Sequence, residues 1–171
     1  MNELIIVKPE KCTGCNSCIR SCPAPEANIV KQLDNGRFII SVNPDKCIAC
    51  GECVRTCNHG ARDYIDDTEE GMSHLITEKL ILIVSPAIKA ALPTKWKGVL
   101  DWFKGQGCTV YDGAFGADIC TWVHIRAIEQ GTMGNRVTQQ CAAIVKYIET
   151  YQPQMLQNLS PIHSPSACSA I

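Results

Sequence analysis

Eight of the twelve cysteines fall in two copies of one spacing pattern, in which gaps of two, two and three residues separate four cysteines. The first copy comprises Cys12, Cys15, Cys18 and Cys22, and the second comprises Cys47, Cys50, Cys53 and Cys57. Each cysteine of the second copy lies 35 positions after its counterpart in the first. This spacing is typical of proteins that bind a pair of [4Fe-4S] clusters. The pattern therefore predicts two such clusters and the transfer of electrons through them.

A cubane cluster needs four thiolates, one for each iron. Three can come from a single loop with two-residue gaps, and in this motif the fourth comes from the other copy. We therefore predict that cluster one is bound by Cys12, Cys15, Cys18 and Cys57. Cluster two is predicted to be bound by Cys22, Cys47, Cys50 and Cys53. Because the ligands cross between the halves, we expect metal binding and folding to be coupled.

Two other roles for these cysteines, in zinc sites or in disulfides, fit the pattern less well. Paired C-x2-C units are common in zinc sites, but such a site uses four ligands in total. Each copy here packs four cysteines within eleven positions. Structural disulfides are typical of secreted proteins, and no secretory signal opens the chain. The spacing thus favours iron–sulfur clusters.

The composition narrows the class of protein. A length of 171 residues fits one or two small domains. The formal net charge is −1 and no basic stretch is present, which argues against a nucleic-acid partner. The longest apolar run, Leu80–Val84, is too short to span a membrane. We therefore expect a cytoplasmic protein without a membrane span, and iron–sulfur chemistry suggests an anaerobic setting.

The first third of the chain carries signals for short strands around the cysteines. Leu4–Val7 has the pattern of an edge strand, and Asp34–Gly36 is a turn signal between two apolar segments, 28–31 and 37–42. Such a turn between strands predicts a β-hairpin. The segment from Cys18 to Cys22 is about one helical turn long, so we expect a short helix between the two clusters.

The rest of the chain alternates between strand and helix patterns. Residues 62–79 are polar and acidic and are predicted to form a helical connector. Leu80–Val84 has the continuous apolar character of a strand buried on both faces of a parallel sheet. The alternation that follows predicts an α/β layer. Its further expected strands are 109–111 and 137–139, and its expected helices are 95–104, 115–126 and 141–151.

Three segments resemble the iron-only ([FeFe]) hydrogenase large subunit. Val84–Lys89 is similar to the first strand and turn of its catalytic domain, and Tyr111–Asp118 is similar to its Asp-x-x-Phe-x-Ala-Asp segment. Thr138–Ala142 resembles its first active-site loop, Thr-Ser-Cys-Cys-Pro, and Ser164-Pro165 continues the match. The resemblance covers nearly the whole chain and is strongest to the atypical, sensor-like branch, in which a two-cluster ferredoxin domain precedes the hydrogenase domain.

The resemblance implies an α+β ferredoxin-like dicluster domain followed by a partial α/β (hydrogenase-like) domain. The expected boundaries are 1–66 for the ferredoxin-type domain, 67–79 for the connector and 80–171 for the hydrogenase-like domain.

The resemblance also implies what the second domain could bind. In the family, the catalytic H-cluster is held by four cysteines on three loops, and Cys141 matches the cubane ligand of the first loop. Gln140 replaces the neighbouring proton-relaying cysteine, and Ala142 replaces the proline. The two later loops would lie beyond Ile171. We therefore expect a truncated product or fragment, or a chain that needs a second polypeptide.

The chain is therefore not expected to be catalytic alone. Its implied partners are a redox protein or the missing C-terminal half of a hydrogenase. A redox- or hydrogen-sensing domain is the alternative function, and hydrogenase activity would require the missing half.

The remaining cysteines and one histidine leave alternatives open. Cys108, Cys120 and Cys168 could join Cys141 in a third metal site, but their spacing matches no compact motif, and buried cysteines often pack as small apolar residues. Cys141 could also be a free thiol at a turn into a helix. His59 could tune cluster one from nearby or be an ordinary polar loop residue.

Overall fold

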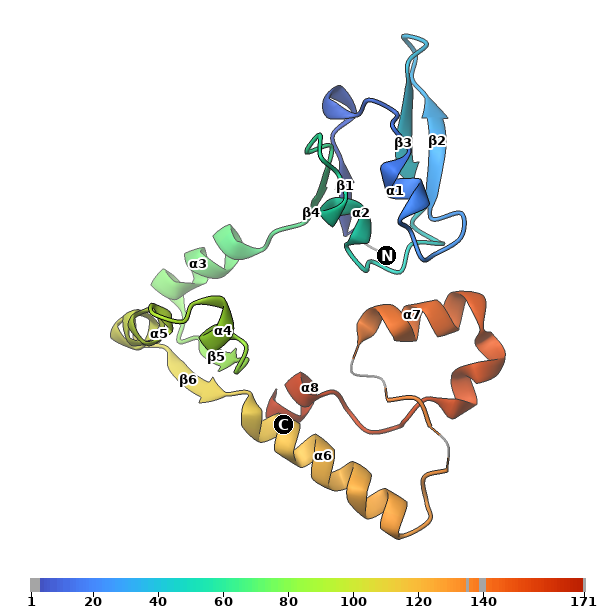
Figure 1. The fold of residues 1–171 in the computed structure, drawn as a ribbon. Coiled ribbons are helices and arrows are strands. Elements are labelled where there is room, and N and C mark those ends of the chain that lie inside the picture. The colour runs from blue at the N-terminus through green and yellow to red at the C-terminus, as the bar shows by residue number, and fades with distance from the viewer. Residues whose placement is uncertain (1–3, 135, 139–140, 171) are drawn as a thin grey trace. The chain divides into compact units, whose positions relative to one another are not determined.

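The computed structural model describes residues 4–134, 136–138 and 141–170 (Figure 1). The chain divides into two compact units. Unit 1 contains the described residues up to Asp66 together with Cys141–Leu156. Unit 2 contains the described residues of Asp67–Gln140 and of Gln157–Ile171. Helices and strands occur in both.

Unit 1 contains two small antiparallel sheets. In one, β1 (Ile5–Val7) pairs with β4 (Arg62–Tyr64), so the ends of the cysteine-rich segment lie side by side. In the other, β2 (Asn28–Gln32) pairs with β3 (Phe38–Val42). The predicted strand near the N-terminus and the predicted hairpin are therefore confirmed. Gly36 sits in the turn with φ 78°, a conformation that glycine adopts without steric cost.

The helical connector was predicted to begin at residue 62, which is before the observed helix starts. Residues 62–64 form β4 rather than helix, and the helix α3 spans Thr68–Thr77. The prediction was wrong for residues 62–67, of which the first three form the strand, because a short polar segment carries no strand pattern of its own. Its conformation comes from hydrogen bonds to β1, which lies far away in the sequence.

The sequence repeat is also a structural repeat. A single 3-10 turn, η1 (Pro9–Lys11), precedes the first cysteine loop. The short helices α1 (Ser17–Arg20) and α2 (Glu52–Arg55) are offset by the same 35 positions as the cysteines. The helix predicted between Cys18 and Cys22 is α1, and Cys22 lies two residues beyond its end.

The core of unit 1 follows the repeat as well. Its buried residues are Ile5, Ile40, Cys18 and Cys53, which form two pairs that are each separated by 35 positions. Apolar side chains and candidate ligands therefore share one small core.

Helix α7 (Ala142–Tyr151) belongs to unit 1 and not to an α/β layer as predicted. Its side chains pack on a buried apolar group of Ala24, Ala27 and Ile48. The Tyr151 hydroxyl also bonds to two backbone carbonyl oxygens of the cysteine-rich segment. The helix itself is correctly predicted, but its amphipathic pattern did not indicate which surface it would cover. The short 3-10 segment η2 (Pro153–Asn158) follows it.

Unit 2 contains a two-stranded parallel sheet, in which β5 (Ile81–Val84) pairs with β6 (Thr109–Asp112). The predicted helices at 95–104 and 115–126 are confirmed. The helices of this unit besides α3 are α4 (Ile88–Ala91), α5 (Trp96–Gly105), α6 (Ala114–Glu129) and α8 (Pro165–Ala170).

Two predictions about this sheet are wrong for the described residues. Strand β5 is not buried on both faces, since Ile81 is 66% and Ile83 is 38% exposed. A two-stranded sheet offers helices too little surface to cover both of its faces. Val137 forms an isolated bridge with Leu159 rather than a third strand, and Gln139 lies outside the described residues.

Helices α6 and α8 pack closely because a glycine lies between them. A Cβ atom at Gly116 would overlap Ser169 Oγ and the Pro165 carbonyl oxygen. The residue is buried in α6. The absence of a side chain at this position therefore allows the backbone of α8 to rest against α6.

Candidate functional site

The two cysteine loops share an unusual backbone conformation. Left-handed φ angles occur at Gly14 (70°) and Asn16 (61°) in the first loop, and at Ala49 (56°) and Gly51 (76°) in the second. These positions correspond under the 35-residue offset. Left-handed backbone is uncommon outside glycine, so its presence at Asn16 and Ala49 indicates that the loop shape is specified by the fold. These two residues were not predictable from the sequence, because glycine marks only one member of each pair.

The first predicted ligand set lies around a single cavity. Its lining includes Cys12, Cys15 and Cys18 from the first run, together with Cys57 from the second. The structure thus brings together four thiols that come from both halves of the repeat. His59 lines the same cavity, near the location considered for it from the sequence.

Three members of the second predicted set, Cys22, Cys47 and Cys53, lie near one another. Burial raises the pKa of Cys53 to about 11, against the opposing charge of Arg62. Neighbouring thiolates at Cys47, Cys18 and Cys22 raise this pKa further by repulsion. Cys22, from the first run, therefore lies near two cysteines of the second.

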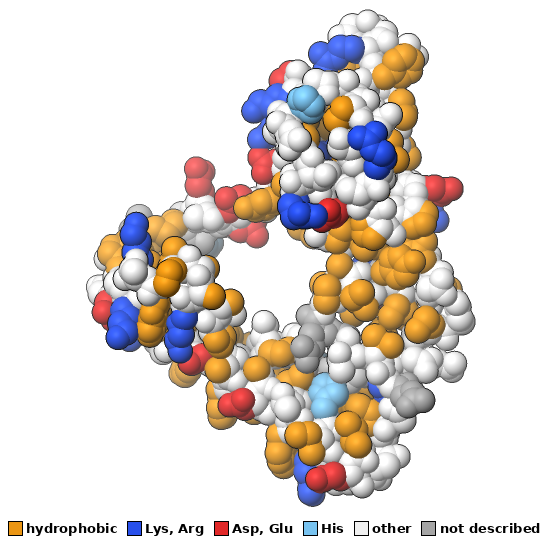
Figure 2. Space-filling view, viewed as in Figure 1, with side chains coloured by type: hydrophobic (Ala, Val, Ile, Leu, Met, Phe, Trp, Pro, Cys, Tyr) orange, Lys and Arg blue, Asp and Glu red, His pale blue; other side chains and the backbone are white. Residues whose placement is uncertain are grey.

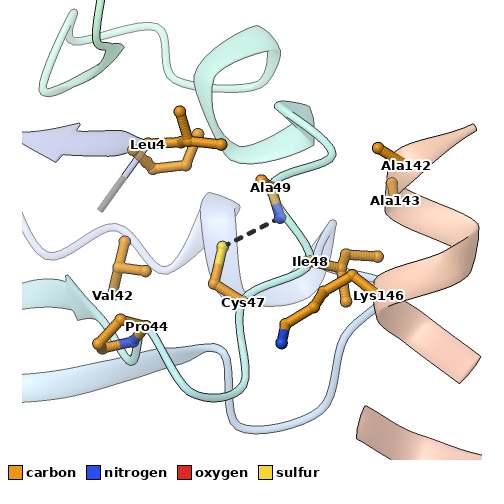
Figure 3. A pocket seen from close by; sticks show the side chains of 10 residues that line it. Leu4, Val42, Pro44, Cys47, Ile48, Ala49, Ala142, Ala143 and Lys146 are labelled. Carbon is orange, nitrogen blue, oxygen red and sulfur yellow. Dashed lines mark hydrogen bonds between the residues drawn. The ribbon is translucent and has the colours of Figure 1, made fainter. Parts of the chain in front are cut away.

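Backbone N–H groups are directed at thiol sulfurs in both loops. The Ile40 N–H donates to Cys12 Sγ over 3.5 Å, and the Ala49 N–H donates to Cys47 Sγ over 3.4 Å (Figure 3). Such hydrogen bonds stabilise negative charge on sulfur and are among the features that set the potential of an iron–sulfur cluster. Soft thiol donors with N–H groups beside them fit an anionic [4Fe-4S] cluster.

The middle cysteine of each loop lies at the surface. Cys15 and Cys50 are both exposed. Hydrogen bonding to Ser17, through its side chain and its backbone, lowers the pKa of Cys15 to about 7. A large fraction of this thiol is therefore ionised near neutral pH, and the thiolate is the form that binds metal.

No three cysteine, histidine or acidic side chains within the described part of the chain converge on one metal ion. The thiolates of a cubane each bind a different iron, so they have no common point of ligation.

A buried arginine beside the first cavity was not identified from the sequence. Arg62 is 5% exposed and lines the cavity of the first set. Its Nη2 donates to the Ile40 carbonyl oxygen over 2.9 Å and to Cys18 Sγ over 3.5 Å. Its Nη1 has no hydrogen-bond partner among the described residues. An arginine in a polar segment gives no local signal of burial, since arginine is mostly exposed in proteins.

Comparison with known families agrees with both halves of this description. A family model of the 4Fe-4S dicluster domain matches residues 4–69. A family model of the iron only hydrogenase large subunit, C-terminal domain, matches residues 78–171, which is more than half of the chain. The chain belongs to the iron-only hydrogenase large subunit family. The resemblance noted from the sequence is confirmed, and so is the fold class, a dicluster domain followed by a hydrogenase-like domain.

The hydrogenase match includes the residues that resemble the first active-site loop. Cys141 is exposed and directly precedes α7, while Gln140 lies outside the described residues. Helix α7 thus belongs to the iron-only hydrogenase domain by sequence and to unit 1 by packing. No helix of the described part of the chain has the length and apolar character needed to cross a membrane.

The other cysteines of the hydrogenase-like segment have local partners or are buried. The thiols of Cys120 and Cys168 both donate to the His163 carbonyl oxygen, over 3.4 and 3.6 Å. Cys120 is 1% exposed, and Cys108 is also buried. Both have the burial expected of cysteines that pack as small apolar residues. A third metal site stays a prediction that no contact here supports.

Proposed function

We propose that this iron-only hydrogenase family member holds two [4Fe-4S] clusters and relays electrons between them. Cluster one is assigned to Cys12, Cys15, Cys18 and Cys57, and cluster two to Cys22, Cys47, Cys50 and Cys53. The observation that carries the proposal is the presence of Cys57, from the second run, in the cavity lined by three cysteines of the first. The crossed arrangement is the one that the two-cluster motif requires.

Each cluster would supply a one-electron redox couple when bound. The surrounding residues support that chemistry in three ways. The left-handed loops curl the chain so that cysteines with two-residue gaps can serve one cluster. Backbone N–H groups stabilise sulfur charge at Cys12 and Cys47. The buried positions of Cys18 and Cys53 keep water away from the centre of the unit.

Helix α7 supports a connection between cluster two and the hydrogenase part of the chain. Its residues Ala142, Ala143 and Lys146 line a cavity together with Cys47 and Ile48 (Figure 3). The helix starts directly after Cys141, which matches an H-cluster ligand in the family. We infer that electrons pass between cluster two and the hydrogenase side along this contact.

The surface of unit 2 supports a further protein partner. Figure 2 shows apolar side chains on the visible surface of this unit. Exposed apolar patches are typical of surfaces that contact other proteins. We propose that a redox partner or a further hydrogenase polypeptide covers them, and that Cys141 ligates metal only in that assembly. The most exposed large apolar residues of the unit are Ile81, Tyr111, Phe115, Trp122, Ile125 and Ile128. Redox or hydrogen sensing stays a prediction.

The proposal is tested by anaerobic reconstitution of the chain with iron and sulfide. We expect about eight iron atoms per chain, as two four-iron clusters require. We also expect the EPR spectrum of the dithionite-reduced protein to contain signals from two interacting [4Fe-4S]⁺ centres. A Cys168→Ser variant, which changes a cysteine outside both runs, should give the same result. About four iron atoms per chain, or tightly bound zinc, would contradict the proposal.

A further inference from the structure

The 35-residue repeat allows the surroundings of the two cysteine sets to be compared position by position. Five residues other than cysteine that line the cavity of the first set are polar, and three of them have buried apolar counterparts beside the second set. The three pairs are Thr13 and Ile48, His59 and Ala24, and Arg62 and Ala27. The cysteines therefore repeat, but their environments differ.

The apolar counterparts are covered by α7. Ala24, Ala27 and Ile48 are between 2% and 6% exposed, and Cys22 and Cys47 pack against them. Tyr147 and Tyr151 of α7 complete this packing. The second set therefore lies against a mainly apolar surface, where additional negative charge is poorly solvated. The cation nearest to it on α7, Lys146, lines a cavity with Cys47 and is paired with Glu149 at 3.9 Å.

The first set instead has a buried positive charge. The Arg62 guanidinium is within hydrogen-bond distance of Cys18 Sγ, at 3.5 Å. It is also beside the cavity that contains Cys12, Cys15 and Cys57. A charge in a low-dielectric interior acts far more strongly than one in water, and its effect decreases with distance. Arg62 also influences Cys53 of the second set, since its charge opposes the rise of that pKa. The direct hydrogen bond, however, is to Cys18.

We propose that Arg62 makes cluster one the more readily reduced of the two clusters, an inference that rests on the proposed function. Reduction adds one negative charge to a cluster. A nearby guanidinium and an N–H to sulfur bond stabilise that charge, whereas an apolar covering does not. Electrons that arrive from the α7 side would therefore pass from cluster two to cluster one and remain there. The direction of electron transfer would then depend on a buried position at which the two halves of the repeat differ, with Arg62 in one half and Ala27 in the other.

The test is an EPR-monitored redox titration of the reconstituted chain and of its Arg62→Met variant. Methionine removes the charge and the N–H donors but retains an extended, unbranched side chain. We expect the midpoint potential of cluster one, which is the higher of the two in the wild-type protein, to decrease. The midpoint potential of cluster two should stay unchanged. The predicted effect is about a tenfold change in the electron distribution between the clusters, which corresponds to about 59 mV for a one-electron couple.

The matched control is Arg126→Met. It makes the same change of charge at an arginine of α6 that is exposed and bonded to Glu129. Both potentials should stay unchanged in this variant. The proposal is overturned if Arg62→Met decreases only the lower of the two wild-type potentials. It is also overturned if the substitution shifts both potentials equally or leaves both unchanged.

A measurement on the wild-type protein does not depend on the folding of a variant. In the one-electron-reduced protein, NMR of assigned cysteine β-protons identifies the cluster that carries the electron. We expect the shifts of Cys12, Cys15, Cys18 and Cys57 to report the reduced cluster. Localisation on the other set overturns the inference and leaves the proposed function intact. An iron content near four would instead refute the proposed function itself.

Discussion

Tyr151 attaches the end of α7 to the cysteine-rich segment through one hydroxyl group. The hydroxyl bonds to the Pro25 carbonyl oxygen over 2.6 Å and to the Lys46 carbonyl oxygen over 2.7 Å. Both carbonyls are close in sequence to candidate ligands, Cys22 and Cys47. Burial raises the pKa of Tyr151, and the nearby Cys22, Glu26 and Cys47 raise it further. The hydroxyl therefore keeps its proton, and remains a donor, at neutral pH.

Replacing this residue tests whether α7 belongs to the cysteine-rich unit in solution. We expect Tyr151→Phe to destabilise the packing of α7 by about 0.5–1.5 kcal/mol, because the Pro25 and Lys46 carbonyl oxygens, which share the hydroxyl proton, lose their donor. Hydrogen exchange of the α7 amides should become faster by a corresponding factor. Tyr111→Phe, at a tyrosine that is 55% exposed, serves as the control and should change little. Unchanged exchange in Tyr151→Phe would show that the contact does not hold the helix.

The chemistry of the site was predictable from the sequence because it depends on residues at fixed short spacings. The two runs identify all eight cysteines of the predicted ligand sets. Arg62 was not predictable in the same way. Its burial follows from the pairing of β4 with β1 and from its bond to the Ile40 carbonyl oxygen. These contacts join segments that are distant in the sequence.

At the scale of elements, the contact between α6 and α8 depends on the small size of one residue. Gly116→Ala introduces a methyl group that would meet the backbone of α8 at Pro165 as well as the Ser169 side chain. We expect a loss of about 1–3 kcal/mol in stability, as for other overpacked sites. Faster hydrogen exchange in α8 should accompany it.

The control substitution is expected to change the stability in the opposite direction. A Cβ atom at Gly98, within α5, would meet no atom within 4 Å. Gly98→Ala should therefore stabilise the helix by up to about 1 kcal/mol, since alanine favours helix more than glycine does. Denaturant unfolding of both variants measures the difference. Equal effects of the two substitutions would show that α8 does not pack on α6 as described.

The elements themselves were predictable to the extent that their patterns are local. The turn at Asp34–Gly36 and the amphipathic pattern of α5 each identify an element without reference to the rest of the chain. The third strand expected at 137–139 failed because an apolar residue such as Val137 fits a single bridge as well as a strand. The predicted location of α7 was wrong for a similar reason, since periodicity identifies the apolar face of a helix but not the surface on which that face packs.

At the scale of the whole molecule, unit 1 is a pair of related halves that share one core. Ile5 and Ile40, and likewise Cys18 and Cys53, are equivalent residues of the two halves and pack together. Pairing of β1 with β4 joins the two ends of the repeat. The proposed ligands cross in the same way, so that neither half could complete a cluster alone. Folding and cluster binding should therefore depend on each other.

The central claim, that the ligands of the two clusters cross between the halves, is tested most directly by Cys22→Ser together with Cys57→Ser. Each variant is reconstituted anaerobically, its iron is counted, and its dithionite-reduced EPR spectrum is compared with that of Cys168→Ser. We expect Cys22→Ser to perturb the cluster bound by Cys47, Cys50 and Cys53, and Cys57→Ser to perturb the other. Iron should fall below about eight atoms per chain in both. Two intact paramagnetic signals in Cys22→Ser, with undiminished iron, would contradict the crossed arrangement.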